Sequence, residues 1–223
     1  MATCTLHRPF TSADWSRTLI EYKAAGHNEM RRLFSPATWL STSTSALIID
    51  IGSYTGEDIK SFLQRAGPLA RNVSIQTYEP VPSMSAKLIR SMKLYRQVVV
   101  HNYGLGASTY SACIMGTGDG VRLVRKNGML RCSGRTEVVD VRRALSKYHR
   151  PIDLLQINCE GCEAAVLQRL LERPTPLVIR AIEVQWHRVN SEQTYCNTEA
   201  MLRARGYVMD YRYPYVWERW VRK

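Results

Sequence analysis

The sequence predicts a single α/β domain built on a mostly parallel sheet with helices on both faces. From residue 46 onward, short apolar runs alternate with helical stripes, an order typical of repeated strand–helix units. The first run, residues 46–51, ends at Gly52 and is apolar enough for a strand buried on both faces. The 223 residues suffice for a full core, and their 45% apolar content excludes a disordered chain.

The other elements follow in alternating order. Apolar periodicity predicts helices over 59–66, 84–92, 166–171 and 193–205, and strands over 73–78, 98–101, 152–157 and 177–184. Residues 108–139, rich in glycine and basic side chains, predict an irregular region with short strands, and a short helix follows Asp140. Tyr211, Tyr213, Tyr215 and Trp217 alternate strictly, which predicts one final strand with an aromatic face.

The first 45 residues are expected to form a helical extension, because apolar residues recur at helical spacing within 12–34. Residues 46–223 then form the main domain. No apolar run is long enough to span a membrane, and the first fifteen residues lack a secretory apolar core. The sequence therefore predicts a soluble, cytoplasmic protein.

The six cysteines are scattered, and in a reducing compartment we expect free, mostly buried thiols. Cys159 and Cys162 form the only close pair. A structural zinc site needs four ligands, and no second cysteine pair or paired-histidine motif completes one, so no metal is expected.

Basic residues exceed acidic ones, 31 against 19, which gives a formal net charge of +12. The excess is concentrated in residues 121–150. This segment is either a solvated basic face or a docking patch for an anionic substrate, a nucleic acid or an acidic surface.

The turn after the first strand carries the first candidate site, Asp50-Ile-Gly52-Ser53-Tyr54-Thr-Gly56. Its glycines permit a tight turn against which a ligand can lie. The spacing lacks the middle glycine of a dinucleotide motif, and Asp50, Glu57 and Asp58 would repel phosphate. A cationic nucleoside such as S-adenosylmethionine suits this environment better; a merely tight turn is the structural alternative.

Two further candidate sites follow later strands. Glu79, in Tyr78-Glu79-Pro80, comes where a carboxylate can accept both hydroxyls of a ribose. The segment Asn158-Cys-Glu160-Gly-Cys-Glu163 leads from the fourth strand into its helix, beside the reactive end of such a cofactor. Glu163 alternatively complements the dipole of that helix.

Together the three motifs resemble the FkbM-type methyltransferases, whose patterns are Asp-x-Gly-Ala-Asn-x-Gly, Phe-Glu-Pro and Lys-Ile-Asp-x-Glu-Gly-x-Glu. The resemblance spans about residues 46–190, with Tyr54 in place of the usual Asn and Asn158 in place of the usual Asp. It implies the class I methyltransferase Rossmann-like fold: a mostly parallel seven-stranded sheet with helices on both faces and a C-terminal antiparallel strand. It also implies S-adenosylmethionine as cofactor.

By that resemblance, Asp50, Gly52, Tyr54 and Gly56 surround the methionine part of the cofactor, and Glu79 holds the ribose. Ser53, Pro80 and Asn158 belong to the same expected binding site. Tyr103 and Gly104 follow the third strand, where they would flank the adenine. Because Asn158 lacks the family's negative charge, metal ligation is not expected at this position.

Methyl transfer to a hydroxyl needs a group that takes the proton, and histidine is the commonest choice. His187 follows the fifth strand at the expected catalytic edge, so it is the first candidate base, with Glu160 and Glu163 as alternatives. A structural histidine beside Trp186 is the competing interpretation.

The sequence thus predicts an S-adenosylmethionine-dependent O-methyltransferase acting on a hydroxylated small molecule or glycan, with an anionic acceptor compatible with the basic segment. Two alternatives stay open. One is an RNA or DNA methyltransferase that uses residues 121–150, with nucleic acid the less favoured partner. The other is a catalytically silent cofactor-binding module, suggested by Asn158.

Overall fold

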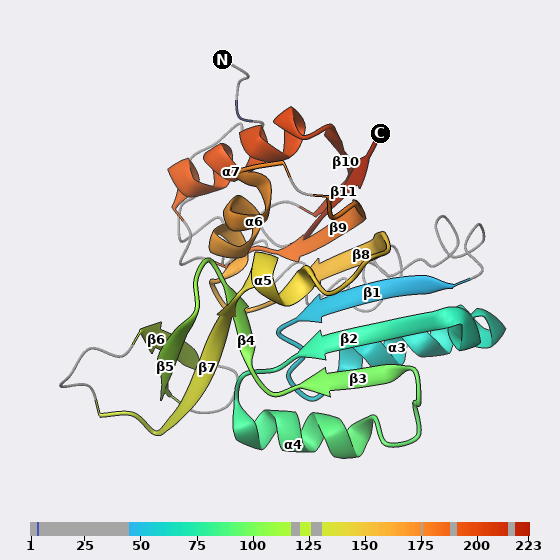
Figure 1. The fold of residues 1–223 in the computed structure, drawn as a ribbon, viewed down its shortest axis with the longest axis vertical. Coiled ribbons are helices and arrows are strands. Elements are labelled where there is room, and N and C mark those ends of the chain that lie inside the picture. The colour runs from blue at the N-terminus through green and yellow to red at the C-terminus, as the bar shows by residue number, and fades with distance from the viewer. Residues whose placement is uncertain are drawn as a thin grey trace.

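The computed structural model describes residues 4, 45–116, 121–125, 131–174, 176–187, 191–213 and 217–223. The predicted helical extension over residues 12–34 lies outside these residues. A seven-stranded sheet forms the centre of the molecule, in the order β10-β11-β9-β8-β1-β2-β3 (Figure 1). Its strands are β1 (Ala46–Ile51), β2 (Val73–Tyr78), β3 (Val98–His101), β8 (Ile152–Ile157), β9 (Ile179–Gln185), β10 (Tyr207–Tyr213) and β11 (Trp217–Arg222).

Neighbouring strands from β3 through β1 to β9 run parallel, and β11 pairs antiparallel with both β9 and β10. This arrangement confirms the predicted fold class: a mostly parallel, seven-stranded Rossmann-like sheet of the class I methyltransferase type, with an antiparallel C-terminal strand. The chain order reverses at β1, whose neighbours are β2 and β8. Open α/β sheets bind ligands at such a switch point, beyond the carboxyl ends of the strands.

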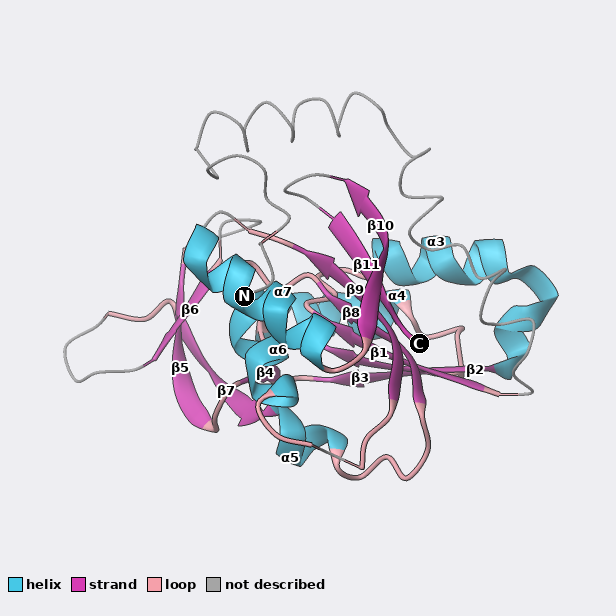
Figure 2. Ribbon diagram, turned by 90° about the horizontal axis from the view of Figure 1, so that it is seen from above, coloured by secondary structure: helices cyan, strands magenta, loops and turns pink. Residues whose placement is uncertain are grey.

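Helices cover both faces of this sheet because β1 is apolar on both (Figure 2). Leu47, Ile49 and Ile51 face one core cluster, and Ala46 and Ile48 face the other. The first cluster includes residues of α5 (Val141–Leu145), α6 (Glu163–Leu171) and α7 (Glu192–Ala204). The second includes residues of α3 (Glu57–Ala66) and α4 (Pro82–Ser91), and a short 3₁₀ helix, η2 (Gly67–Asn72), follows α3.

A second sheet fills the region predicted to be irregular. Its strand order is β4-β7-β5-β6, with β4 (Gly104–Gly106), β5 (Tyr110–Met115), β6 (Arg122–Arg125) and β7 (Gly134–Asp140). It lies beyond the carboxyl ends of β1, β2 and β3, toward which their arrows point (Figure 1). The second sheet therefore stands where a ligand of the main sheet would bind.

The prediction of one final aromatic strand is wrong. Tyr211 and Tyr213 belong to β10 and Trp217 to β11, and these strands pair antiparallel with Tyr213 opposite Trp217. Tyr215 lies outside the described residues. The alternation therefore spans two strands, which period alone does not reveal.

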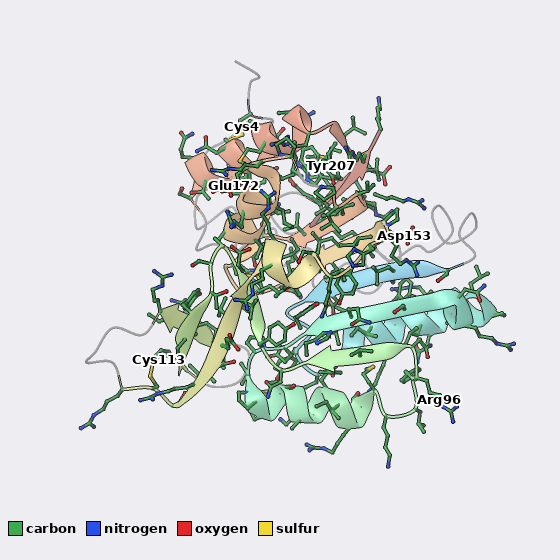
Figure 3. All side chains as sticks on the ribbon, viewed as in Figure 1. Cys4, Arg96, Cys113, Asp153, Glu172 and Tyr207 are labelled. Carbon is green, nitrogen blue, oxygen red and sulfur yellow. A yellow bond between two sulfur atoms is a disulfide. The ribbon has the colours of Figure 1, made fainter. Side chains whose placement is uncertain are left out.

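The prediction of free thiols is also wrong, because the six cysteines form three disulfides: Cys4–Cys196, Cys113–Cys132 and Cys159–Cys162. The first joins residues 192 positions apart, and the second lies on the second sheet, where Cys113 is seen in Figure 3. Such pairs are created by the fold, and cysteine spacing does not specify them. The expectation of a reducing compartment loses its support.

No described helix has both the length and the apolar character needed to cross a membrane.

Candidate active site

A cavity of about 770 Å³ lies between the carboxyl edge of the main sheet and the second sheet, within the usual range for ligand sites. One wall comes from the turns after β1 and β2 and from the loop between β8 and α6. The other wall comes from residues 104–110, β6 and Val138. Of the sequence-predicted residues, Gly52, Tyr54, Glu79, Pro80, Gly104, Asn158 and Glu160 line it.

Gly52 brings the turn after β1 against the loop after β8. Its φ of +88° suits glycine, and its N–H donates to the carbonyl of Tyr78 at 3.0 Å. The N–H of Asn158 donates to the carbonyl of Ile51 at 2.8 Å. A Cβ at position 52 would lie 2.0 Å from the carbonyl oxygen of Asn158. The close approach of these two backbones therefore requires glycine.

Asp50 supports this turn from below. It is buried, accepts hydrogen bonds from the hydroxyls of Ser53 and Thr77, and is not among the residues that line the cavity. Burial raises the pKa of Asp50 to about 7. The Gly56 N–H donates to the carbonyl of Ser53 at 2.9 Å, which completes the turn before α3. The structure thus gives Asp50, Ser53 and Gly56 a role in shaping the turn.

Glu79 is one of the two acidic residues among the described residues that line the cavity. Only 5% exposed, it accepts hydrogen bonds from the N–H of Tyr54 at 2.9 Å and the N–H of Val81 at 2.8 Å. Burial raises the pKa of Glu79, and these two backbone bonds oppose the rise. The carboxylate is thereby oriented by both turns, with lone pairs remaining for a ligand.

Tyr103 does not line the cavity, although Gly104 does. The ring of Tyr103 contacts the edge of Tyr78 at a centroid distance of 5.4 Å, and His101 stacks on Tyr78 at 4.6 Å. Of this aromatic cluster, Tyr78 is the member that lines the cavity. The prediction that Tyr103 flanks an adenine is not supported by its position.

The three predicted catalytic residues lie together. His187 Nδ1 is 2.6 Å from Glu163 Oε1, and His187 Nε2 is 3.1 Å from Glu160 Oε1. Glu163 is fully buried and also accepts the N–H of Gly161 at 3.0 Å, which places it beneath the loop. Glu160 lines the cavity, whereas His187 is not among its lining residues. His187 is therefore connected to the cavity through its contact with Glu160.

The charges of this triad are coupled. Burial alone would lower the pKa of His187, but its contacts with Glu160 and Glu163 outweigh that effect and raise the pKa to about 9. Burial alone would raise the pKa of Glu163, yet the bonds from His187 and Gly161 lower it. At neutral pH the histidine is an imidazolium between two carboxylates, so the triad carries a net charge of −1.

This coupling predicts a pH-dependent contribution of His187 to stability. The pKa is raised from 6.5 to about 9, so the stabilisation is complete below pH 6.5 and is lost as the pH rises through 9. We expect the unfolding free energies of wild type and His187→Gln to differ by about 2 kcal/mol at pH 6, since Glu160 is half exposed. The difference should vanish near pH 10 in urea denaturation. A difference independent of pH would contradict the imidazolium.

The loop of Glu160 has an unusual backbone. Glu160 has a φ of +55° and Gly161 a φ of +116°, and the disulfide Cys159–Cys162 closes the loop on either side of them. A positive φ is costly for glutamate and persists only where the surroundings hold it. The disulfide and Glu163, which accepts the N–H groups of Cys159 at 3.3 Å and Gly161, provide that support.

The sequence interpretation missed the second sheet as a wall of the cavity. Tyr110, Arg122 and Arg125 line it, together with Met84 from α4. The basic character of residues 121–150 was the available signal, but only the fold connects it with the turns after β1 and β2. Among the described residues, no group of three or more His, Cys, Asp and Glu side chains could hold a metal ion.

No protein-family model matches the chain, and no curated protein matches it. The resemblance to the FkbM-type family is therefore not confirmed.

Solved structures of similar shape include three methyltransferase-type proteins. An rRNA methylase from Streptococcus thermophilus has a TM-score of 0.47 at 10% identity, covering 84% of this chain and 93% of its own. Aeropyrum pernix fibrillarin with natively bound S-adenosyl-L-methionine has a TM-score of 0.46 at 10% identity, covering 80% of this chain and 67% of its own. Precorrin-6y C5,15-methyltransferase from Geobacter metallireducens has a TM-score of 0.44 at 13% identity, covering 82% of this chain and 73% of its own. All three TM-scores lie below 0.5, so these likenesses carry no argument about activity.

Proposed function

We propose that the protein transfers a methyl group from S-adenosylmethionine to a hydroxyl of a small molecule, with a sugar or glycan as the expected acceptor class. The observation that carries the proposal is Glu79, a buried carboxylate fixed by the N–H groups of Tyr54 and Val81 in the cavity wall. A carboxylate so placed suits the two hydroxyls of a ribose. Nearby Gly52 leaves the backbone of its turn bare for the rest of the cofactor.

The cofactor end of the cavity is poorly suited to phosphate. Its acidic side chains are Glu79 and Glu160, and no lysine or arginine belongs to the described lining residues of this wall. The sulfonium of S-adenosylmethionine, which supplies the methyl group when bound, is a cation and fits such a wall. A dinucleotide would instead place a pyrophosphate there.

Glu160 is the proposed proton acceptor, because it lies in the cavity wall and His187 lies behind it. Bound S-adenosylmethionine would supply the methyl group to the acceptor oxygen, and the carboxylate of Glu160 would take the proton of that hydroxyl. The imidazolium of His187 holds that carboxylate, and buried Glu163 holds the imidazolium. The transfer would remove the positive charge of the sulfonium and the net negative charge of the triad. The net charge of the site would therefore stay the same.

Glu79→Ala is expected to abolish measurable cofactor binding, because it removes the acceptor for two ribose hydroxyls and leaves the N–H groups of Tyr54 and Val81 unpaired. Isothermal titration calorimetry with S-adenosylhomocysteine measures this directly. Glu137→Ala, an exposed change on β7 away from the cavity, is the control. Equal affinity in wild type and Glu79→Ala would overturn the proposed site.

We also propose that the protein works in an oxidising compartment. Disulfides persist mainly in secreted, lumenal or periplasmic proteins. The three bridges weigh against the cytoplasm that the sequence suggested.

A further inference from the structure

The wall of the cavity opposite Glu79 and Glu160 is basic. Residues Arg122 to Arg125 of β6 all belong to the lining. Arg125 pairs with Ala112 and lies on the face of the sheet that carries Tyr110, whereas Arg122 pairs with Met115 on the opposite face. The cavity is therefore negative along the main sheet and positive along the second sheet. A cationic cofactor bound at the main sheet and an anionic acceptor bound at the second sheet would together match this charge distribution.

Arg125 is held in a defined orientation. Its guanidinium lies over the ring of Tyr110, 4.9 Å from the ring centroid, and its Nη2 donates to Ser108 Oγ at 2.9 Å. Tyr110 and Ser108 are themselves lining residues. A guanidinium has five N–H donors in a rigid fork, and stacking on an aromatic ring leaves most of them available. The stack thus prepares Arg125 to bind an oxyanion.

The guanidinium of Arg125 has no carboxylate partner among the described residues. Across the described part of the chain, no ion pair joins Arg122 or Arg125 to an aspartate or glutamate, whereas Arg142, Arg169 and Arg180 all have carboxylate partners. An uncompensated guanidinium in the wall of a cavity attracts an anion.

We propose that Arg125 forms a subsite for an oxyanion, a phosphate, sulfate or carboxylate, on the hydroxylated acceptor. The inference rests on the proposed function, since it identifies the anion as part of the methyl acceptor. A small acceptor is favoured over a nucleic acid because Arg125 lines a cavity bounded by two sheets. Nucleic acids are bound by many phosphate contacts along an extended surface.

The charge arrangement also orients the acceptor. An anionic group on β6 directs the remainder of the molecule across the cavity toward Glu160, on the opposite wall. A hydroxyl at that end then lies beside the proposed proton acceptor. Electrostatic complementarity of this kind gives specificity for acidic over neutral acceptors.

Inorganic sulfate is the probe that tests the subsite without knowledge of the natural acceptor. Calorimetric titration with sulfate, at ionic strength matched with chloride, should show saturable binding to wild type. The variant Arg125→Gln should bind sulfate about tenfold more weakly or worse, because charge-assisted hydrogen bonds are lost. Arg135→Gln removes an exposed charge from β7 of the same sheet without touching the cavity, so it should bind as wild type does.

Absence of saturable sulfate binding by wild type, or equal weakening in Arg135→Gln, would overturn the subsite. The same titrations with S-adenosylhomocysteine separate the two proposals. If Arg125→Gln loses affinity for S-adenosylhomocysteine itself, Arg125 holds the carboxylate of the cofactor and the acceptor assignment is wrong. If wild type binds sulfate but not S-adenosylhomocysteine, the methyltransferase proposal fails while the anion site stands. Competition of a short single-stranded RNA for the sulfate site, with weaker binding of glucose 6-phosphate, would favour a nucleic-acid acceptor and contradict the small-molecule proposal.

Discussion

Gly52→Ala is expected to eliminate cofactor binding and to lower the free energy of unfolding by about 2–5 kcal/mol. The new Cβ would lie 2.0 Å from the carbonyl oxygen of Asn158 and 2.9 Å from the Cα of Cys159, both backbone atoms. The turn after β1 and the loop after β8 must then separate, which displaces Tyr54 on one side and Glu160 on the other. Urea denaturation and calorimetry with S-adenosylhomocysteine measure the two effects.

Gly206→Ala is a matched control for this change. Gly206 has a φ of +82°, close to the +88° of Gly52, but a Cβ there would have no neighbour within 4 Å. It therefore carries the backbone cost of a left-handed alanine, roughly 1–2 kcal/mol, without the collision. Equal destabilisation in the two variants, with cofactor affinity retained in Gly52→Ala, would show that the close approach of the two loops is not needed.

Glu160→Gln is expected to lower kcat by about 10²–10⁴-fold, the range typical of a lost general base, while affinity for S-adenosylhomocysteine, which lacks the sulfonium charge, stays unchanged. The amide retains the size of the carboxylate but cannot take a proton. The measurement is labelled methyl transfer to the first hydroxylated acceptor that screening identifies, and Glu137→Gln serves as the control.

The same variant has a readout that needs no acceptor. With Glu160 neutralised, His187 loses one of the two carboxylates that raise its pKa, so the pKa of His187 should fall below about 9 in an NMR titration. An unchanged pKa would show that Glu160 does not hold the imidazolium. A normal kcat with a lowered pKa would assign proton acceptance to His187 instead.

The main sheet and one half of the site were predictable because their signals are local. Glycines and carboxylates stand directly after apolar runs, and the carboxyl ends of parallel strands meet at one edge, so Gly52, Glu79 and Glu160 could be brought together from sequence alone. His187 and the alternative bases Glu160 and Glu163 were placed at one edge by the same rule, but the contact between Glu163 and His187 is seen only in the structure, where β8 and β9 are neighbours.

The other half of the site was not predictable by this reasoning. In β6 Leu123 is half-buried and the other three residues are exposed, so the strand lacks a buried apolar face that alternation could reveal. Cys113 and Cys132 are joined only because β5 and β7 pair side by side. The roles of Asp50 and Tyr103 depend on which way each side chain points, and the position of a residue at the end of a strand does not determine that.

The second sheet is a single excursion of the chain between β3 and α5, and it interrupts none of the strand–helix units that carry Gly52, Glu79 and Glu160. Mutations can therefore change the length or the charge of this segment without altering the loops that carry Gly52, Glu79 and Glu160. Acceptor choice and donor recognition become separately heritable, and a graft of residues 107–138 between relatives would exchange one without the other.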